Sequence, residues 1–315
     1  MRSLIFVCLL AVPTFAAEPT HTVTPADYAS VSAITEIAVS PDGKHVAYAL
    51  ATWDKAEDNR KSDVWIVRAD GLGKPARVTF DRANDRNLKW AGNKQIHFLS
   101  NRKKPGETKA PYDGTSQVWQ VKLTMVKGEI GGEFFQESSE PRAVTKVEGG
   151  VTGFDYSEEG SLFYTLDKNH SDEDEFAKLR AKYDKVEYGH GVRKVSELHK
   201  LDLSTWRTEK LIGETRYIRS FAATRDGKKI AMVSAFDDTV VKSEGESRVD
   251  VWEAGKVVTP PTDAYRKNSK NSPYAWLENL CWNSNGTRFA FTAVHDAFPS
   301  EVIVGSVESE KWSTN

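Results

Sequence analysis

The sequence predicts an all-β protein, a β-propeller built of four-stranded antiparallel blades. Three observations point to this fold class. A hairpin motif recurs five times along the 315 residues, a second short motif follows each copy, and the composition is that of a globular domain with many loops. The copies return at a period of about 50 to 67 residues, and self-similarity at such a period is typical of propellers and solenoids.

The first motif is a strand, a tight turn and a second strand. Its five copies occupy residues 39–48, 89–98, 155–164, 222–231 and 281–290. Glycine ends the turn in four of them, as in Asp42-Gly43 and Asn285-Gly286. Because glycine reaches positive φ without steric cost, these dipeptides predict hairpins. Apolar and polar residues alternate on both sides of each turn, which indicates half-buried strands.

The second motif supplies a third strand and is followed by a short fourth one. The third strands fall at 63–65, 117–119, 197–199, 250–252 and 301–303, and fourth strands at 76–79, 142–145, 209–212 and 256–259. We expect the aromatic residue of the third strand to fill the gap between blades. A β-sandwich would not repeat this order of elements. The sequence therefore predicts about five blades, with the fifth ending after its third strand near Asn315.

The N-terminal residues predict a secretory signal peptide over 1–17. Arg2 is followed by an apolar run from Leu4 to Val12, and Ala16 and Ala17 offer a small-residue cleavage site. The run is too short to span a bilayer. The predicted domain organisation is therefore a signal peptide over 1–17 and a propeller over 18–315, exported to the periplasm or secreted.

Cleavage of the predicted signal peptide would remove Cys8 and leave Cys281 as the single cysteine. An intrachain disulfide is then impossible. Cys281 lies on an alternating strand, so we expect it to be a small buried side chain and not a reactive thiol.

Two inserts interrupt the blades. Residues 103–115 are rich in Lys, Gly and Pro, which predicts an exposed loop. Residues 171–186 predict a helix, the only one expected after the signal peptide. Ser171 can cap it, acidic residues fill its first turn, and Phe176, Leu179 and Tyr183 share one face.

The hairpin repeats resemble those of the TolB propeller. They resemble still more the N-terminal propeller of the prolyl oligopeptidase (S9) family of serine peptidases, because the helical insert and the run 188–198 resemble an insertion in exported members. The resemblance covers nearly all of the chain after the signal peptide. It implies a propeller that acts as a lid over a C-terminal α/β-hydrolase domain and admits short or unfolded peptides.

A hydrolase domain of that family carries its nucleophile in a Gly-x-Ser-x-Gly elbow. No serine in this sequence has glycines at both second-neighbour positions. The sequence therefore predicts a non-catalytic, substrate-gating propeller region without the catalytic Ser, Asp and His, inactive as a peptidase on its own. The alternative is a TolB-like periplasmic propeller that binds a protein partner.

The titratable residues form no pattern that predicts a catalytic, metal or cofactor site. The seven histidines are scattered at positions 21, 45, 97, 170, 190, 199 and 295, without the spacing of metal ligands. The acidic run Asp172–Glu175 could hold a peptide amino terminus, as the resemblance to dipeptidyl peptidases implies, but an acidic first turn that stabilises its own helix is the favoured interpretation. Arg193 and Lys194 could bind a carboxylate, although a solvated basic turn is favoured.

The expected partners follow from the charge and the repeats. A net charge of −2 gives no indication of a nucleic-acid partner. A peptide substrate reached through the hydrolase domain, or a protein partner, is expected. A propeller with unclosed blades is also expected to expose apolar sheet surface and to self-associate.

Overall fold

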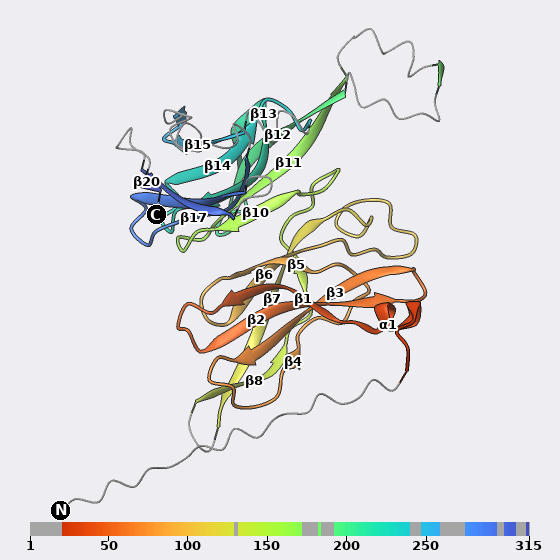
Figure 1. Ribbon diagram of the computed structural model, residues 1–315. Helices are drawn as coiled ribbons and strands as arrows, with labels where there is room; N and C mark the ends of the chain where they lie inside the picture. Colours follow the sequence, from red (N-terminus) through yellow and green to blue (C-terminus); the bar gives the residue numbers. More distant parts are fainter. Residues whose placement is uncertain are drawn as a thin grey trace, which may run out of the picture.

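The computed structural model describes residues 21–128, 132–171, 182–183, 192–239, 247–258, 275–294, 299–306 and 313–314. These residues form antiparallel sheets and one short helix, α1 (Pro25–Ser30). Within this described part of the chain, no helix has the length and apolar character needed to cross a membrane. Figure 1 shows the sheets arranged one after another in chain order.

Blades 1 and 2 each contain the predicted four strands. Blade 1 consists of β1 (Ala33–Val39), β2 (His45–Asp54), β3 (Asn59–Arg68) and β4 (Ala76–Arg77), paired in that order. Blade 2 consists of β5 (Arg86–Trp90), β6 (Gln95–Ser100), β7 (Gln117–Lys127) and β9 (Arg142–Ala143). An additional strand, β8 (Glu133–Ser138), pairs with the far half of β7.

Blades 3 and 4 form one continuous seven-stranded sheet. Its strands are β10 (Gly153–Tyr156), β11 (Ser161–Ser171), β12 (Val192–Asp202), β13 (Thr208–Ala223), β14 (Lys229–Ala235), β15 (Arg248–Glu253) and β16 (Lys256–Val258). Residues 208–216 of β13 pair with β12, and residues 217–223 pair with β14. The same strand is therefore the fourth strand of blade 3 and the first strand of blade 4.

Blade 5 corrects one expectation from the sequence. It consists of β17 (Trp276–Trp282), β18 (Arg288–Val294), β19 (Glu301–Ser306) and β20 (Ser313–Thr314). The blade was expected to end after its third strand, but Ser313 and Thr314 pair with Val304 and Ile303 and begin a fourth. The last residues are polar, so hydrophobic patterning does not reveal them as a strand.

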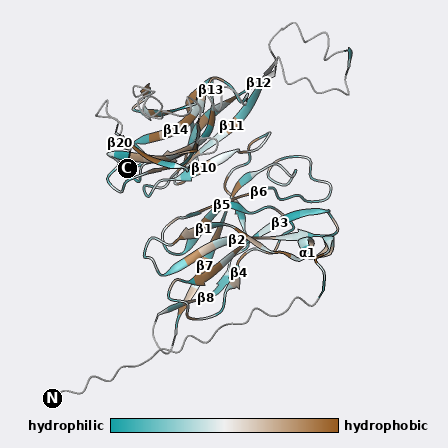
Figure 2. Cartoon of the chain, in the orientation of Figure 1, coloured by the Kyte–Doolittle hydropathy of each residue, from teal (hydrophilic) through white to brown (hydrophobic). Residues whose placement is uncertain are grey.

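Within the described residues the hydrophobic core consists of four clusters, one between each pair of successive blades. Blades 1 and 2 share Ile66, Phe98 and Trp119, and blades 4 and 5 share Val251 and Phe291. The other two clusters join blade 2 to blade 3 and blade 3 to blade 4. In Figure 2 the apolar segments lie within the strands and the loops are mostly hydrophilic. Face-to-face packing of four-stranded sheets is the arrangement of a β-propeller, so the predicted fold class is confirmed.

The third-strand aromatic residues act as expected where a preceding blade is present. Trp119 is 1% exposed in the cluster between blades 1 and 2. Trp65 has the same position in blade 1, but it stacks on Tyr48 with ring centroids 6.4 Å apart and is only half-buried, because that face has no neighbouring blade in the described chain. Ile37 and Val39 on the same face are 71% and 58% exposed.

Cys281 is exposed, so its predicted burial is wrong. A bulge between Glu278 and Cys281 reverses the alternation of β17, so Cys281 pairs with Ala290 on the face of blade 5 that points away from blade 4. Leu277 and Phe291, on the opposite face, are buried against blade 4. Alternation alone cannot reveal which face of a blade has a neighbour.

The repeat alignment of blade 4 is displaced by two residues in the sheet. In blade 1, Trp65 pairs with Tyr48. In blade 4, Met232 lies at the position of Tyr48, and its partner is Asp250. Trp252, which matches Trp65 in the sequence motif, pairs with Ile230 instead. A shift of two residues keeps each side chain on the same face, so the hydrophobic pattern does not detect it.

The local predictions outside the blades had mixed outcomes. Helix α1 was missed, and the claim that 171–186 holds the only helix is wrong. Asp27 accepts hydrogen bonds from the backbone N–H and the hydroxyl of Thr24, at 2.6 and 2.8 Å. These contacts cap the N-terminus of α1, and the sequence does contain the Thr and Asp at the required spacing. Most of 171–186 lies outside the described residues.

The 103–115 segment lacks strands, as expected, but Tyr112 packs edge-on against Trp119 at 5.4 Å, so this loop is not wholly exposed.

Candidate functional site

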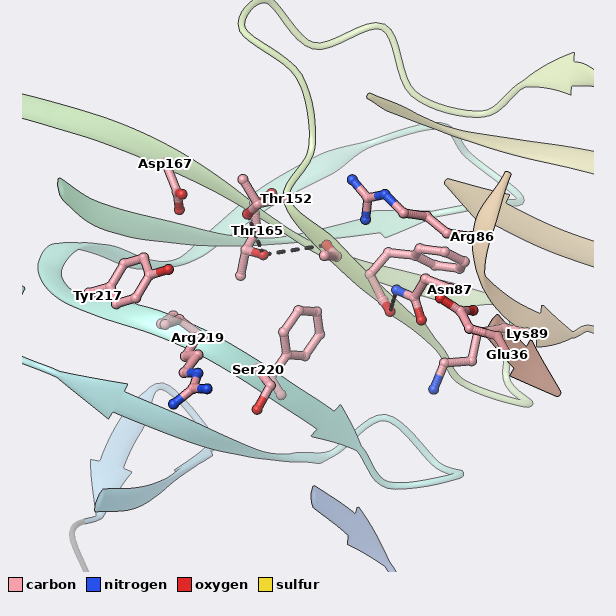
Figure 3. A pocket seen from close by; sticks show the side chains of 14 residues that line it. Glu36, Arg86, Asn87, Lys89, Thr152, Thr165, Asp167, Tyr217, Arg219 and Ser220 are labelled. Carbon is pink, nitrogen blue, oxygen red and sulfur yellow. Dashed lines mark hydrogen bonds between the residues drawn. The ribbon is translucent and has the colours of Figure 1, made fainter. Parts of the chain in front are cut away.

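The first strands of the blades converge on a polar pocket with a volume of about 350 Å³. β1, β5, β10 and β13 all contribute to it, and so does β11. The lining residues are Glu36, Arg86, Asn87, Lys89, Thr152, Gly153, Phe154, Thr165, Asp167, Tyr217, Ile218, Arg219, Ser220 and Phe221. Figure 3 shows their side chains approaching one another from separate strands. Since first strands are the innermost elements of a propeller, we call this space the axial pocket.

Hydrogen bonds between blades fix the strands on the blade 2 side of the pocket. The Glu36 carboxylate of blade 1 accepts a 3.1 Å hydrogen bond from the backbone N–H of Leu88 in blade 2. The Asn87 side-chain amide donates a 3.1 Å hydrogen bond to the carbonyl oxygen of Phe154 in blade 3. Each blade thus holds the inner strand of the next.

Asp155 holds blades 2, 3 and 4 together at one point. One carboxylate oxygen lies 3.1 Å from the Lys89 ammonium of blade 2. The other accepts a 2.8 Å hydrogen bond from the backbone N–H of Ala223 in blade 4. The Asp155 side chain is only 11% exposed, so solvent screens this pair less than it screens a surface salt bridge.

The axial pocket carries both signs of charge. Arg86, Lys89 and Arg219 supply cations, and Glu36 and Asp167 supply carboxyl groups. The Arg219 guanidinium lies 4.1 Å above the ring of Trp276 and pairs with the Glu278 carboxylate, 3.7 Å away.

Asp167 and Tyr217 form the more buried end of the pocket. The Ser196 hydroxyl donates a 3.0 Å hydrogen bond to Asp167. Burial nevertheless raises the pKa of Asp167 above its usual range, and burial also raises the pKa of the Tyr217 hydroxyl. The hydroxyls of Thr152 and Thr165 lie 3.0 Å apart beside them. Together these groups offer hydrogen-bond donors and acceptors to a polar ligand.

Among the residues singled out from the sequence, none that the structure describes lines the axial pocket. Lys194, which was considered for binding a carboxylate, lies 3.6 Å from Asp238. His170 lies in β11, but its side chain, together with His190, His295, the acidic run Asp172–Glu175 and the side chain of Arg193, falls outside what the structure describes. The described residues contain no group of three or more His, Cys, Asp or Glu arranged to hold a metal ion.

Three histidines have packing roles within the blades. Burial lowers the pKa of His97 to about 4, and its ring contacts Tyr156 of blade 3 edge-on at 5.3 Å. His199 stacks on Tyr164 at 5.2 Å, as expected for a histidine within a strand. The buried His45 ring lies 3.2 Å from the backbone oxygen of Glu133, which links β8 to blade 1.

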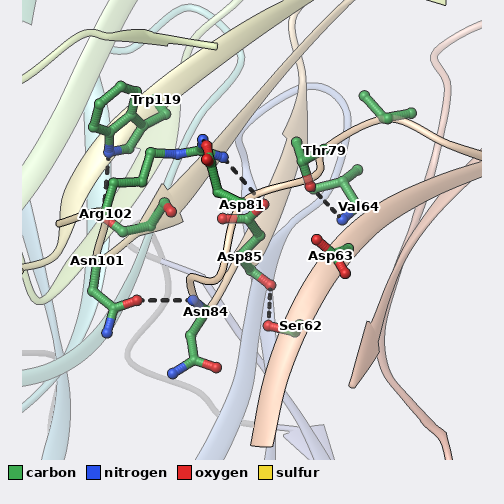
Figure 4. A network of polar contacts seen from close by, with 12 residues as sticks. Ser62, Asp63, Val64, Thr79, Asp81, Asn84, Asp85, Asn101, Arg102 and Trp119 are labelled. Carbon is green, nitrogen blue, oxygen red and sulfur yellow. Dashed lines mark hydrogen bonds and ion pairs between the residues drawn. The ribbon is translucent and has the colours of Figure 1, made fainter. Parts of the chain in front are cut away.

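A second polar cluster lies between blades 1 and 2, away from the axial pocket. Arg102 is 6% exposed and contacts the carboxylates of Asp81 and Asp85, the latter at 3.4 Å. Its guanidinium also lies 5.0 Å above the ring of Trp119. Ser62 donates a 2.8 Å hydrogen bond to the backbone oxygen of Asp85. Figure 4 shows these groups tying the connection between the two blades to both of them.

Burial dominates the protonation of this second cluster. It raises the pKa of Asp85 to about 7 and lowers the pKa of Arg102 to about 10. Among the described residues, one oxygen of Asp85 and one of Asp63 have no hydrogen-bond partner. Arg102 and Asp85 are buried while Asp81 is exposed at the edge of the cluster, and these contacts are those of a structural junction.

Comparison with known proteins shows which proteins this chain resembles in sequence and in fold. No family model matches the chain. Dipeptidyl-peptidase 5 of Porphyromonas endodontalis is 26% identical over 179 residues, which are 52% of this chain and 22% of that relative. The matched segment therefore spans less than a quarter of the relative's length.

Solved structures share the fold at low sequence identity. An acylaminoacyl peptidase of Pyrococcus horikoshii has a TM-score of 0.54 at 12% identity, covering 92% of this chain and 40% of that one. A putative TolB of Agrobacterium tumefaciens has a TM-score of 0.50 at 14% identity, covering 90% and 80%. An oligogalacturonate lyase in complex with manganese has a TM-score of 0.55 at 11% identity, covering 89% and 64%. The chain is thus a β-propeller, similar in fold to TolB and to an acylaminoacyl peptidase and similar in sequence over about half of its length to a dipeptidyl-peptidase 5, as its repeats predicted.

Proposed function

We propose that this chain is the non-catalytic, substrate-gating propeller region of an exported serine peptidase of the prolyl oligopeptidase type. The observation that carries the proposal is the sequence similarity to dipeptidyl-peptidase 5 over half of the chain. Fold similarity alone would not separate a peptidase from a lyase or a binding protein, because one fold hosts many functions.

The axial pocket gives the proposal a physical basis. A volume of about 350 Å³ lies in the range of small-ligand sites and suits a few residues of extended peptide, not a folded domain. The lining hydroxyls and charged groups can pair with peptide N–H and C=O groups, which would otherwise lose their hydrogen bonds to water. Selection of short or unfolded chains would then follow from the small volume of the pocket.

Export is part of the same proposal. Residues 1–17 have the pattern of a signal peptide. In a bacterial host, the mature protein should be recovered from the periplasm or the medium with its first residue at Ala17 or Glu18. Mass spectrometry of the intact secreted chain checks this, and a retained Met1 would contradict it.

A TolB-like protein-binding propeller is the second candidate. It is supported by the fold similarity to the Agrobacterium protein, 80% of which is covered. Such a module would bind a folded partner through its exposed surface, and short peptides would have no measurable affinity for the axial pocket.

Peptide binding separates the two candidates. We would titrate the full chain with fluorescein-labelled tri- to hexapeptides and follow fluorescence polarisation, with mass spectrometry to detect cleavage. The gating proposal expects binding of short peptides, no products and no labelling by a fluorophosphonate. A matched control presents the same hexapeptide sequence inside a small folded domain, which should not bind.

Two results would contradict the gating proposal. Labelling of a single serine would show that the chain itself carries a nucleophile. Failure of every short peptide to bind would favour the TolB-like candidate. The genomic sequence after the codon for Asn315 supplies an independent check, because the proposal expects a Gly-x-Ser-x-Gly elbow to be encoded there.

Self-association is also proposed for the isolated chain. Ile34, Ile37 and Val39 of β1 are each more than half exposed, and contiguous apolar surface of this kind favours contact with other chains. Light scattering across a concentration series should show oligomers, and a monomer at all concentrations would count against this expectation.

A further inference from the structure

We propose that Gly153 of β10 is the point at which the main chain of a bound peptide contacts the axial pocket, so that the pocket recognises an extended backbone and not particular side chains. This inference rests on the proposed function, since it assumes that a peptide occupies the pocket. It names the part of the peptide that is recognised and the residue that makes room for it.

The backbone conformation of β10 does not require a glycine at position 153. Gly153 is the first residue of the strand and pairs with Thr165. Its φ lies outside the left-handed region, so any residue could adopt this conformation. Glycine weakens a strand because it has no side chain to pack, and one reason for its presence is the close approach of a ligand or of another backbone.

A side chain at position 153 would enter the axial pocket. Gly153 lines the pocket, and an added Cβ would lie 3.4 Å from the Thr165 hydroxyl oxygen and 3.7 Å from the Phe221 ring, which line it as well. These are ordinary contact distances, so the fold accommodates a methyl group. The methyl group would nevertheless occupy space that glycine leaves to a ligand. Figure 3 shows Thr165 in the middle of the lining, between Tyr217 and Asn87.

The inner edge of β10 is open to an extended chain. β10 stands at the end of its sheet order, so it pairs with β11 on one side only. The first strands on either side of it, β5 and β13, have β-bulges between Arg86 and Lys89 and between Ile218 and Ser220, whereas β10 is regular. Bulges bend a strand and are frequent beside binding sites. The free edge of β10 thus offers main-chain groups to a peptide, as in recognition by strand addition.

Each charged side chain of the lining already has a partner within the protein. Lys89 and Arg219 form ion pairs with carboxylates at 3.1 and 3.7 Å. Glu36 and Asp167 accept hydrogen bonds at 3.1 and 3.0 Å, and Arg86 donates one at 3.1 Å. The lining therefore gives little preference to a charged ligand.

Neutral polar groups lie on both sides of Gly153. The Asn87 amide donates a 3.1 Å hydrogen bond to the carbonyl oxygen of Phe154 in β10, which shows that side chains of the pocket reach the main chain of this strand. The Tyr217 hydroxyl lies on the other side. A peptide main chain presents neutral N–H and C=O groups, which need such partners when they leave water.

Two kinds of change to the peptide separate main-chain from side-chain recognition. Fluorescein-Ala-Ser-Ala-Ser-Ala-NH2 is compared with a copy that is N-methylated at its central alanine, and with copies that carry Gln or Leu there. Each is titrated with the full chain by fluorescence polarisation. We expect N-methylation to weaken binding roughly tenfold or more, because it removes an N–H donor, and the side-chain changes to alter it by less than about threefold.

Gly153→Ala then locates the contact. The variant should fold, and it should bind the parent peptide roughly tenfold more weakly. Gly213→Ala is the matched control, because Gly213 is also a strand glycine with φ outside the left-handed region, an added Cβ there would meet nothing within 4 Å, and it does not line the pocket. It should bind as the unsubstituted chain does. Circular dichroism and urea denaturation of both variants confirm that their sheets are intact.

The outcomes keep this inference and the proposed function apart. Unchanged binding by the Gly153 variant would overturn the inference and leave peptide gating standing. Side-chain changes that weaken binding more than N-methylation does would also overturn it, because the pocket would then read side chains. If no peptide binds the unsubstituted chain, the proposed function fails and this inference fails with it.

Discussion

The indole N–H of Trp282 donates a 2.9 Å hydrogen bond to the carbonyl oxygen of Ala222 in the preceding blade. Trp90 makes the same bond, also at 2.9 Å, to the carbonyl oxygen of Ala38. Both tryptophans are the last residue of a first strand. One hydrogen bond therefore recurs at two of the four blade junctions, in addition to the apolar clusters.

Replacing Trp282 with phenylalanine tests this bond. Trp282→Phe keeps an aromatic ring against Phe289, which the indole contacts edge-on at 5.4 Å. The substitution removes the indole N–H, so the carbonyl oxygen of Ala222 loses this hydrogen-bond donor. We expect the free energy of unfolding to fall by about 1–3 kcal/mol. Urea denaturation measures this. Trp206→Phe, at a residue 57% exposed, is the control and should change little.

Two hairpin glycines form a matched pair for a second prediction. Gly43 and Gly227 both have positive φ, +70° and +64°. A Cβ at Gly43 would meet nothing within 4 Å, whereas at Gly227 it would lie 3.2 Å from Phe163 and from Ser157 of blade 3. Gly43→Ala should cost about 1–2 kcal/mol for the backbone conformation alone, and Gly227→Ala should cost more. Equal losses of unfolding free energy for the two variants, measured by urea denaturation, would show that Phe163 and Ser157 of blade 3 move aside for the added Cβ at little cost.

Asp85 predicts a pH dependence of stability. Its pKa rises from 3.8 to about 7 in the folded chain because it is buried. Between about pH 4 and pH 7 the unfolded chain ionises this group and the folded chain does not. The free energy of unfolding should therefore fall as the pH rises through this window, by at most about 1.4 kcal/mol per pH unit, and this contribution should be flat above it.

Asp85→Asn isolates that contribution. The variant cannot ionise at this position, so its unfolding free energy should depend less steeply on pH between 4 and 7 than that of the unsubstituted chain. Urea denaturation at pH 4.5, 6.0 and 7.5 measures the slopes. Asp81→Asn removes the other, 60% exposed partner of Arg102 and serves as the control. Parallel slopes for the Asp85 variant and the unsubstituted chain would mean that Arg102, 3.4 Å away, keeps Asp85 ionised.

The sequence reveals the blades well because each is encoded locally. Turn glycines such as Gly43 and Gly286 and the alternation around them specify hairpins within ten residues. The displaced register of Trp252 and the exposure of Cys281 were not predictable in this way. The register of Trp252 depends on which residue lies opposite it, and a shift of two residues leaves period-two alternation unchanged. The exposure of Cys281 follows from the bulge after Glu278, which reverses the alternation of the strand.

The axial pocket was hidden from sequence reasoning for a related reason. Arg86, Asp167 and Arg219 lie in three different blades, and no short motif contains two of them. Their meeting follows only from the stacking of the blades. The useful signal was the position of Arg86 and Arg219 on first strands and of Asp167 on the second strand of its blade, since a charged side chain on an inner strand must face either the axis or a neighbouring blade.

The continuous strand β13 joins blades 3 and 4 without an intervening loop. Ile212, from the part that pairs with blade 3, and Ile218, from the part that pairs with blade 4, belong to one hydrophobic cluster. A single residue gained or lost between them would turn one isoleucine out of that cluster. Insertions and blade-by-blade duplication are therefore constrained at this junction, and the two blades should be inherited as a pair, while the loops joining the other blades leave evolution free to lengthen or exchange them.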